Sequence, residues 1–184
     1  GLKNLNGTDR PGLIALKEVA LTKAEVGVYE VGFQLGPRLN AAGRLKSAGV
    51  ALDLLLTPDA AVAKKLALEL DEHNKERQRT QKEISDDLID GLHLRFDPEK
   101  DFAIVEGQAH WHIGVVGIVA GRVKDEFYRP AIVLGGDGDL LRGSGRSVTG
   151  FDLAAALREC DDLLIDHGGH AMASGLTMEP DKLD

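Results

Sequence analysis

The sequence is poor in cysteine, in aromatic residues and in long apolar runs, and each shortage excludes a class of protein. A single cysteine, Cys160, allows no intramolecular disulfide, which fits a reducing cytoplasm, and without clustered histidines a zinc site is not expected. No apolar run approaches the roughly 20 residues that span a membrane, and the first residues lack the pattern of a signal peptide. The net charge of −8 argues against broad, non-specific attraction to nucleic acid, although it is compatible with arginines gathered in one groove.

No motif in the sequence carries out hydrolysis by itself. There is no Gly-Lys-Ser/Thr phosphate loop, no dinucleotide-binding glycine fingerprint and no Gly-x-Ser-x-Gly turn. A metal-dependent phosphoesterase needs several carboxylates and histidines that converge on one or two ions, and no such spacing occurs. The chain does not begin with Met, and residues 179–184 look like the start of a further helix, so we expect a piece of a longer protein.

Three helices are predicted in the first 57 residues. Residues 11–20 form the first, with Pro11 in its first turn. A capping box at residues 22–25 begins the second, which runs to about residue 35, where Gly36 and Pro37 stop it. Residues 38–44 form a loop, and the third helix runs over residues 47–56. These helices look like the end of a domain.

A long helix begins after Thr57, its predicted cap, with Pro58 at its first position, and no glycine or proline interrupts it before Gly91. At about 1.5 Å per residue it reaches roughly 50 Å. Apolar residues at helical spacing mark its two ends: Val62, Leu66, Leu70, Ile84, Leu88 and Leu92. Its middle, residues 71–83, is polar all round with acids before bases, which favours a bridge between two domains. The alternatives are a surface helix or a coiled-coil arm, and the latter lacks an apolar seam.

After residue 97 the pattern becomes that of an α/β domain with a mixed sheet. Apolar runs at 102–105 and 131–134 predict buried strands. Between them a helix over 114–126 has four valines on one face: Val115, Val116, Val119 and Val123. A turn at 135–139 and a strand over 140–147 complete a hairpin. A helix over 151–159, a helical turn over 163–167 and a strand over 171–178 follow.

Four segments at predicted loops or element ends could bind a ligand. In residues 38–44, Arg38 and Arg44 flank Asn40, and a guanidinium group suits phosphate oxygens; an ordinary loop with salt bridges explains them equally well. In residues 110–117, His112 would lie at a helix start, where free amides bind anions. The alternative there is a buried Trp111 between two solvated histidines.

The third segment is 142–147. Alternation on a strand sends Ser144 and Arg146 to one face and Gly143, Gly145 and Ser147 to the other. Such small residues pack a core poorly, which favours a strand under a ligand with Arg146 on a phosphate. The alternative is a glycine bulge on an edge strand.

The fourth segment, residues 168–175, is the one around which we expect the rest to be organised. Gly168 and Gly169 free the backbone for close approach, His170 follows, and small residues come next. This composition suits a segment that brings backbone and one imidazole to a ligand. It also suits a tight turn into a crowded strand, with His170 as a hydrogen-bonded structural residue.

Taken in this order, the segments resemble motifs of the RecJ family of single-stranded-DNA-specific exonucleases over nearly the whole chain. Residues 38–44 resemble the end of that family's catalytic DHH domain, and the long helix resembles its interdomain connector. Residues 111–120, 144–153 and 168–173 resemble motifs of its DHHA1 domain. Ile113 stands where the family usually has Pro, and Ser174 where it usually has Ala.

The resemblance implies an α/β protein with three parts: helices that end a DHH domain (1–57), a connector helix (58–92) and a DHHA1 domain with a mixed sheet (93–184). It implies a cytoplasmic enzyme of DNA repair and recombination that degrades single-stranded DNA from the 5′ end. The Mn or Mg ions would be held upstream of Gly1, and an oligonucleotide-binding barrel would lie elsewhere. No catalytic residue, bound metal or activity is therefore expected of this chain alone, and no membrane partner.

The resemblance also implies that the DHHA1 domain faces the metal site across a cleft and grips the nucleotide. Nine positions match substrate-binding positions: Arg38, Asn40, Arg44, His112, Ser144, Arg146, Gly168, Gly169 and His170. His170 is interpreted as gripping the substrate, not as a metal ligand or general base.

Two other functions stay open. One is a sibling phosphodiesterase for short oligonucleotides or cyclic dinucleotides, which has a similar Gly-Gly-His signature; the long connector, which suits a longer strand, argues against it. The other is a non-catalytic replication scaffold that keeps the DHHA1 shape, and the residues upstream of Gly1 would decide that case.

Overall fold

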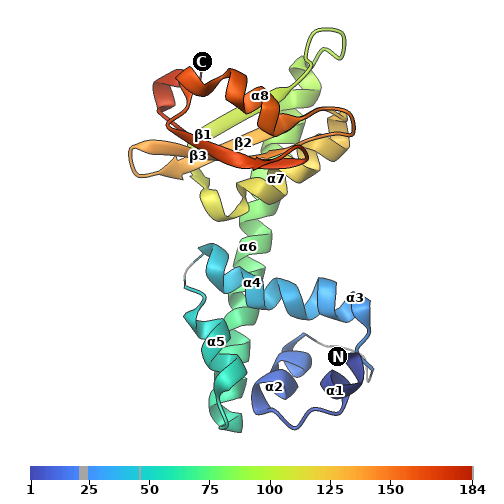
Figure 1. The fold of residues 1–184 in the computed structure, drawn as a ribbon. Coiled ribbons are helices and arrows are strands. Elements are labelled where there is room, and N and C mark those ends of the chain that lie inside the picture. The colour runs from blue at the N-terminus through green and yellow to red at the C-terminus, as the bar shows by residue number, and fades with distance from the viewer. Residues whose placement is uncertain (21–24, 46, 184) are drawn as a thin grey trace. The chain divides into compact units, whose positions relative to one another are not determined.

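The computed structural model describes residues 1–20, 25–45 and 47–183 (Figure 1). The chain divides into two compact units, Gly1–Arg79 and Thr80–Asp184, and helix α6 (Ala60–Arg95) contributes residues to both. The capping box predicted at residues 22–25 falls on the gap between the first two described ranges. Within these ranges no helix is both long and apolar enough to cross a membrane.

Residues 1–79 form a helical unit. Before α6 come α1 (Leu2–Asn6), α2 (Pro11–Val19), α3 (Val28–Glu30), the π-helical turn η1 (Val31–Leu35), α4 (Gly36–Leu45) and α5 (Gly49–Leu56). They share an apolar core that includes Leu16, Val26, Leu35, Leu54 and Leu70. Pro11 occupies the first turn of α2 as predicted, where its missing N–H costs no hydrogen bond.

From Val28 to Leu45 the chain is continuously helical, so the predicted helix stop at Gly36 and Pro37 and the predicted loop at 38–44 are wrong. A proline ring crowds the carbonyl of the preceding turn and usually ends a helix. Here the N–H of Gly36 bonds to the carbonyl of Val31, five residues back. This wider π turn accommodates Pro37 inside the helix.

Helix α6 begins two residues later than predicted and ends three residues later. Its cap is Asp59, not Thr57: the Asp59 Oδ1 accepts the N–H groups of Ala61 at 2.7 Å and Val62 at 2.9 Å. Val62, predicted on the apolar face, is 46% exposed, whereas Leu70, Ile84, Leu88 and Leu92 are buried as expected. The helix passes through Gly91 without a break.

The polar middle of α6 is not solvated all round. Asp71, His73, Asn74 and Gln81 are buried, although residues 71–83 contain no apolar side chain. The predicted acid–base pairing is observed at Lys75, whose Nζ lies 2.7 Å from Glu72 Oε1 and 3.0 Å from Asp71 Oδ2. Burial of amides and carboxylates cannot be read from helical periodicity, because it depends on which polar partners the folded chain supplies.

Residues 80–184 form an α/β unit around a five-stranded mixed sheet, which confirms the predicted fold class. The strands are β1 (Ile104–His112), β2 (Ala131–Asp137), β3 (Leu140–Arg146), β4 (Asp166–His170) and β5 (Ala173–Met178), in the order β1-β2-β3-β5-β4. Strands β1 and β2 are parallel and joined by α7 (Ile113–Phe127), and the other pairs are antiparallel. A crossover helix is the expected link between parallel strands.

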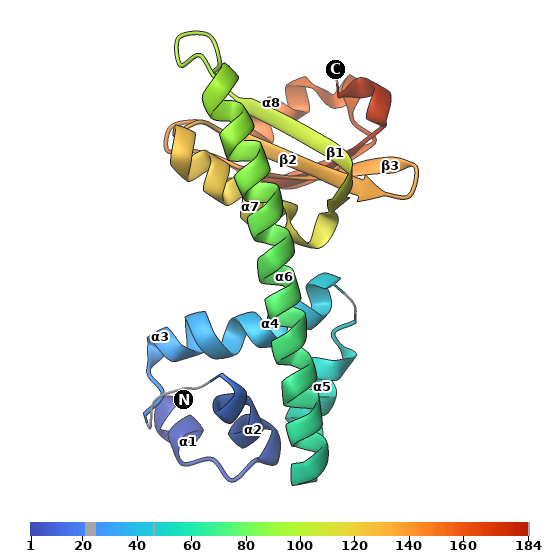
Figure 2. The same ribbon diagram turned by 180° about the vertical axis from the view of Figure 1, so that it is seen from behind.

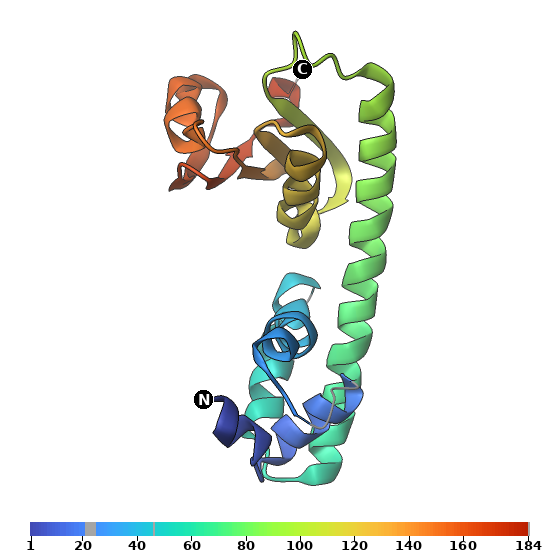
Figure 3. The same cartoon turned by 90° about the vertical axis from the view of Figure 1, so that its right-hand side faces the viewer.

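Helices cover the two faces of this sheet differently. The C-terminal half of α6 and the valines of α7 pack on one face, with Ala131 and Val133 of β2 (Figure 2). Helix α8 (Leu153–Glu159), capped by Asp152, packs on the other face with Leu134 and Leu176 (Figure 3). The four valines predicted on one face of the helix over 114–126 are all buried.

Three predicted elements of this unit are wrong in detail. Residues 135–137 belong to β2, and the turn is only Gly138 and Asp139, with Gly138 at φ 65°. The helical turn predicted over 163–167 is instead the 3-10 turn η2 (Asp161–Leu163) followed by strand β4. Strand β4 carries no apolar alternation, so only its pairing with β5 defines it. The expected helix start at the C-terminus is a 3-10 turn, η3 (Pro180–Lys182).

Candidate nucleic-acid interface

The sheet register brings four of the predicted residues onto one face of β3, β5 and β4. Arg146 of β3 lies opposite Ala173 of β5, which lies opposite His170 of β4. We call these three the Arg146 row. Neighbouring strands are about 4.8 Å apart, so Arg146 and His170 are separated by roughly 10 Å on the same face. Two residues along each strand, Ser144, Gly175 and Gly168 form a second row, the Ser144 row.

Arg146 is held by its own strand. Its Nη1 donates to Ser144 Oγ at 2.9 Å and to the Gly145 carbonyl at 2.7 Å. Helix α7 comes close on this face, because a Cβ at Gly117 would lie 2.8 Å from Ser144 Oγ and 3.2 Å from Arg146 Nη2. Glycine at 117 therefore lets the first turns of α7 approach the Ser144 and Arg146 side chains.

His112 caps α7. Its Nδ1 accepts the N–H of Gly114 at 3.0 Å, so in this arrangement the ring proton is on Nε2, which can donate to an anion. The start of a helix also attracts anions through its amides. Trp111 is buried and His110 is exposed, as the structural alternative for this segment anticipates.

Gly168, Gly169 and His170 lie on β4, and Ala171 and Met172 make the turn into β5. Gly169 has φ 145°, and a Cβ there would lie 2.4 Å from the Ala173 carbonyl oxygen and 2.6 Å from Ser174 Cα. The segment is thus a strand and tight turn that requires glycine at 169. Ser174 Oγ donates to the His170 carbonyl at 3.2 Å, a bond that the family's usual alanine could not make. Gly168 has no such constraint, because a Cβ there meets nothing within 4 Å.

The glycines of β3 serve the core, contrary to the expectation that the whole strand lies under a ligand. A Cβ at Gly145 would lie 2.5 Å from Leu153 Cδ2, and one at Gly143 would lie 2.9 Å from Leu134 Cγ. Leucines of α8 and β2 pack into the space that these glycines leave. The predicted alternation is observed, but only its Ser144 and Arg146 face remains for a ligand.

The three predicted residues of the first unit lie on helix α4. Arg38 Nε donates to Asp71 Oδ1 at 2.8 Å and its Nη1 donates to the Gln34 carbonyl at 2.8 Å. Asn40 and Arg44 are exposed. Asp71 also contacts Lys75, and hydrogen bonds to Glu72 and Asp71 raise the pKa of Lys75. Arg38 is therefore an ion-pair partner within the unit as well as a candidate binding residue.

Sequence reasoning missed a third row on the same face of the sheet. Arg142 of β3 lies opposite Thr177 of β5, which lies opposite Asp166 of β4; we call these the Arg142 row. A cavity of about 360 Å³ lies here, lined by Arg142, Gly143, Asp166, His167, Gly168, Gly175, Leu176 and Thr177. Alternation along β4 puts Asp166 on the same face as Gly168, but the sequence predicts a helical turn over 163–167 and so does not reveal this row.

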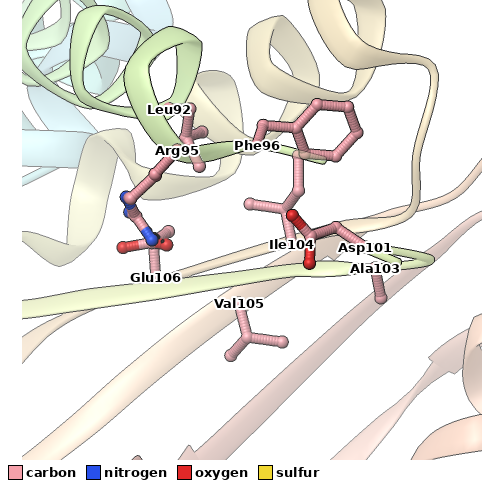
Figure 4. A pocket seen from close by; sticks show the side chains of 8 residues that line it. All are labelled: Leu92, Arg95, Phe96, Asp101, Ala103, Ile104, Val105 and Glu106. Atoms are coloured by element: carbon pink, nitrogen blue, oxygen red, sulfur yellow. Dashed lines mark hydrogen bonds and ion pairs between the residues drawn. The ribbon is translucent and has the colours of Figure 1, made fainter. Parts of the chain in front are cut away.

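A second cavity, of about 270 Å³, lies between the end of α6 and the start of β1 and contains none of the predicted residues. Figure 4 shows Arg95 and Glu106 pointing toward each other at its edge, and their 2.5 Å ion pair joins the helix to the strand. In the loop between α6 and β1, a hydrogen bond from Lys100 lowers the pKa of Asp97. Among the residues that the structure describes, no three or more His, Cys, Asp or Glu side chains are grouped to hold a metal ion.

The part of the chain that holds the mixed sheet is similar to a known class of domain: residues 100–184 match the family model of the DHHA1 domain.

Nearly the whole chain is also similar to RecJ proteins. It is 44% identical to the single-stranded-DNA-specific exonuclease RecJ of Bacillus subtilis over 97% of this chain, and 43% identical to that of Escherichia coli over 96%. It spans 23% and 32% of the length of these relatives. Crystal structures of Thermus thermophilus RecJ with Mg²⁺ and with Mn²⁺ match all of this chain with TM-scores of 0.87 and 0.88 at 36% identity, and the chain covers 28% and 26% of them. The resemblance to the RecJ family is thereby confirmed.

Proposed function

We infer that this chain is the nucleic-acid-binding part of a single-stranded-DNA-specific exonuclease. The observation that carries this inference is the shared face of Arg146, Ser144, Gly168 and His170 beside the start of α7. A guanidinium group and an imidazole stand on either side of Ala173, and the neighbouring row holds nothing larger than serine. A phosphodiester can therefore approach the strands closely between two donors.

Each residue then has a role in binding and orienting the strand. Arg146 binds phosphate oxygens, and its contacts to Ser144 and Gly145 fix the direction of the guanidinium plane. His112 donates from Nε2, since its Nδ1 is used by the helix cap. His170 donates from the opposite side, and Gly168 leaves room for the backbone of the strand. Gly169 sets the conformation that places His170.

The same proposal keeps the domain assignment: residues 1–57 end a DHH domain, 58–92 connect, and 93–184 form the DHHA1 domain. Asn40, Arg44 and Arg38 of the first unit are further proposed contacts to the strand. Digestion from the 5′ end and a role in DNA repair and recombination belong to the whole protein.

Hydrolysis is assigned to residues outside this chain. Two similar structures contain Mg²⁺ or Mn²⁺, but the described ranges offer no cluster of ligands that fits such an ion. In this proposal the chain binds and orients the strand, and we expect it by itself not to release nucleotides from single-stranded DNA in the presence of Mn²⁺.

The test is Arg146→Ala in the 184-residue chain, with binding to fluorescent single-stranded DNA followed by anisotropy at several salt concentrations. Loss of one charged contact should weaken binding about tenfold. The slope of log affinity against log salt should flatten by about 0.7, the value of one phosphate on a single strand. The effect should be similar for different sequences, because phosphate contacts carry no base information.

Arg158→Ala is the matched control, because Arg158 is exposed on α8 on the other side of the sheet. It removes the same charge and should leave the slope unchanged. An unchanged slope in Arg146→Ala would remove the Arg146 row from the binding surface. Binding of a dinucleotide as tightly as a longer strand would favour a phosphodiesterase for short substrates.

A further inference from the structure

The cavity over the Arg142 row is a polar pocket next to the proposed phosphate-binding residues of the Arg146 row, which we call the phosphate grip. Its floor is the pair Gly168 and Gly175. An added Cβ at Gly168 would meet nothing within 4 Å, and one at Gly175 would meet only the Gly143 carbonyl oxygen, at 3.8 Å. Its volume of about 360 Å³ lies in the lower part of the range that small-molecule pockets occupy. The Arg142 row is two residues beyond the Ser144 row and four residues beyond the Arg146 row. The four residues from the Arg146 row to the Arg142 row span on the order of 13 Å along β4.

Charge changes along this face. At one end, Arg146 and His170 present hydrogen-bond donors. At the other end, Asp166 presents a carboxylate, which only accepts hydrogen bonds and repels phosphate. Arg142 is turned to Asp137, with 3.2 Å between its Nε and the Asp137 Oδ2, and Thr177 offers a hydroxyl group. The carboxylate disfavours a second phosphate here and favours a group that donates hydrogen bonds, while Arg142 and His167, which also line the pocket, are paired with Asp137 and Asp161.

A nucleotide has this same polarity, with a phosphate at one end and the N–H groups of a base at the other. We propose that the pocket formed by Asp166, Thr177 and Arg142 receives the base of the nucleotide whose phosphate lies on the Arg146 row, and that Asp166 selects bases with an exocyclic amino group. This proposal rests on the proposed function. Carboxylates accept hydrogen bonds from the N4 amino group of cytosine, whereas thymine presents a carbonyl oxygen at that position.

The consequence is a preference within the pyrimidines, which are of similar size. The chain should bind oligo(dC) about tenfold more tightly than oligo(dT) of the same length, the discrimination of one good base contact. Asp166→Asn replaces the acceptor by an amide that both donates and accepts. It should bring the ratio of the two affinities close to one, chiefly by improving oligo(dT) binding, because a repulsive acceptor is removed.

The measurement is the ratio of anisotropy-derived dissociation constants for oligo(dC) and oligo(dT), in the unchanged chain and in two variants. Asp162→Asn is the matched control, since Asp162 is an exposed residue of η2 and does not line the pocket. It makes the same charge change and should leave the ratio as it is. Both dissociation constants of a ratio are measured with the same variant. A gain in affinity for all DNA that comes from the lost negative charge therefore changes both constants equally and leaves their ratio unchanged.

A ratio that Asp166→Asn does not change would overturn the proposal. If Arg146→Ala still weakens binding and flattens the salt slope in that case, the phosphate grip stands and only the base pocket is wrong. If binding of either oligonucleotide is insensitive to Arg146, the proposed function itself fails, and the base pocket fails with it.

Discussion

The two faces of β3, β5 and β4 use glycine for opposite purposes. On the face toward α8, an added Cβ would lie 2.9 Å from a leucine side chain at Gly143 and 2.5 Å from one at Gly145, and at Gly169 it would lie 2.4 Å from the backbone of β5. Toward the open side, Gly168 and Gly175 have no such neighbours. Glycine on the first face makes room for other parts of the protein, and on the second face it leaves room for a ligand. Composition alone does not distinguish the two uses.

Gly169→Ala tests the filled face most severely. Alanine is strained at φ 145°, and its Cβ would meet backbone atoms of Ala173 and Ser174, which cannot move aside as a side chain can. The expected loss is about 3 kcal/mol of unfolding free energy. It is measured by urea denaturation followed through the fluorescence of Trp111, the single tryptophan of the chain and buried in the second unit. An unchanged urea midpoint would contradict the requirement for glycine there.

Gly145→Ala tests the same face where the obstacle is a side chain. The new methyl group would displace Leu153, which is 2% exposed. Repacking of a full core costs about 2 kcal/mol, less than a backbone collision, and the same fluorescence measurement detects it. A loss equal to that of Gly169→Ala would mean that α8 cannot move relative to β3.

Gly168→Ala tests the open face and should have the smallest effect on stability. The change in unfolding free energy should stay within about 0.5 kcal/mol, because the methyl group enters open space at an unstrained position. Binding of single-stranded DNA should nevertheless weaken, because the methyl group enters the space above the Ser144 row that the strand is proposed to occupy. Unchanged binding of single-stranded DNA by this variant would contradict the proposal that Gly168 leaves room for a ligand. A loss of stability like that of Gly145→Ala would show that the Gly168 position is filled by the protein itself.

The fold class could be predicted from the sequence because it depends on local patterns. The valines of α7 recur at helical spacing, and the run over 131–134 lies buried in β2, so strand, helix and strand follow each other as expected. The burial predicted for the run over 102–105 is wrong, because β1 begins only at Ile104 and both Phe102 and Val105 are exposed. Asp152 and Pro11 likewise mark helix starts through groups within a few residues of them. These signals are hydrogen bonds and periodicities that a short segment satisfies by itself.

Other elements could not be predicted because their cause lies elsewhere in the chain. Pro37 stays inside a helix because a π turn precedes it, and β4 is a strand because β5 pairs with it, although its own residues indicate a turn. The small residues of β3 predict a strand under a ligand, whereas Leu153 of α8 occupies the space beside Gly145, and Leu134 and Leu176 of the neighbouring strands occupy the space beside Gly143.

The nine candidate residues show the same division. Their types and order came from the sequence, and so did the alternation of Ser144 and Arg146. Their assembly came from the register of three strands, which places Arg146 and His170, 24 positions apart, on one face. Arg38 acquires Asp71 as an ion-pair partner only when α4 and α6 are both formed.

By itself, the sequence determined the residue types available for binding, the succession of helices and strands, and the resemblance to the RecJ family. Each of these depends only on patterns within short segments or on the order of those segments. Only the tertiary structure decided which glycines are filled and which are open, and that Asp166 joins Arg142 and Thr177 beside the proposed grip. The physical reason is that the pairing register and the packing partners of a strand depend on other strands and helices. Whether a glycine makes room for the core or for a ligand, and what a carboxylate faces, is therefore decided only when those elements have packed together.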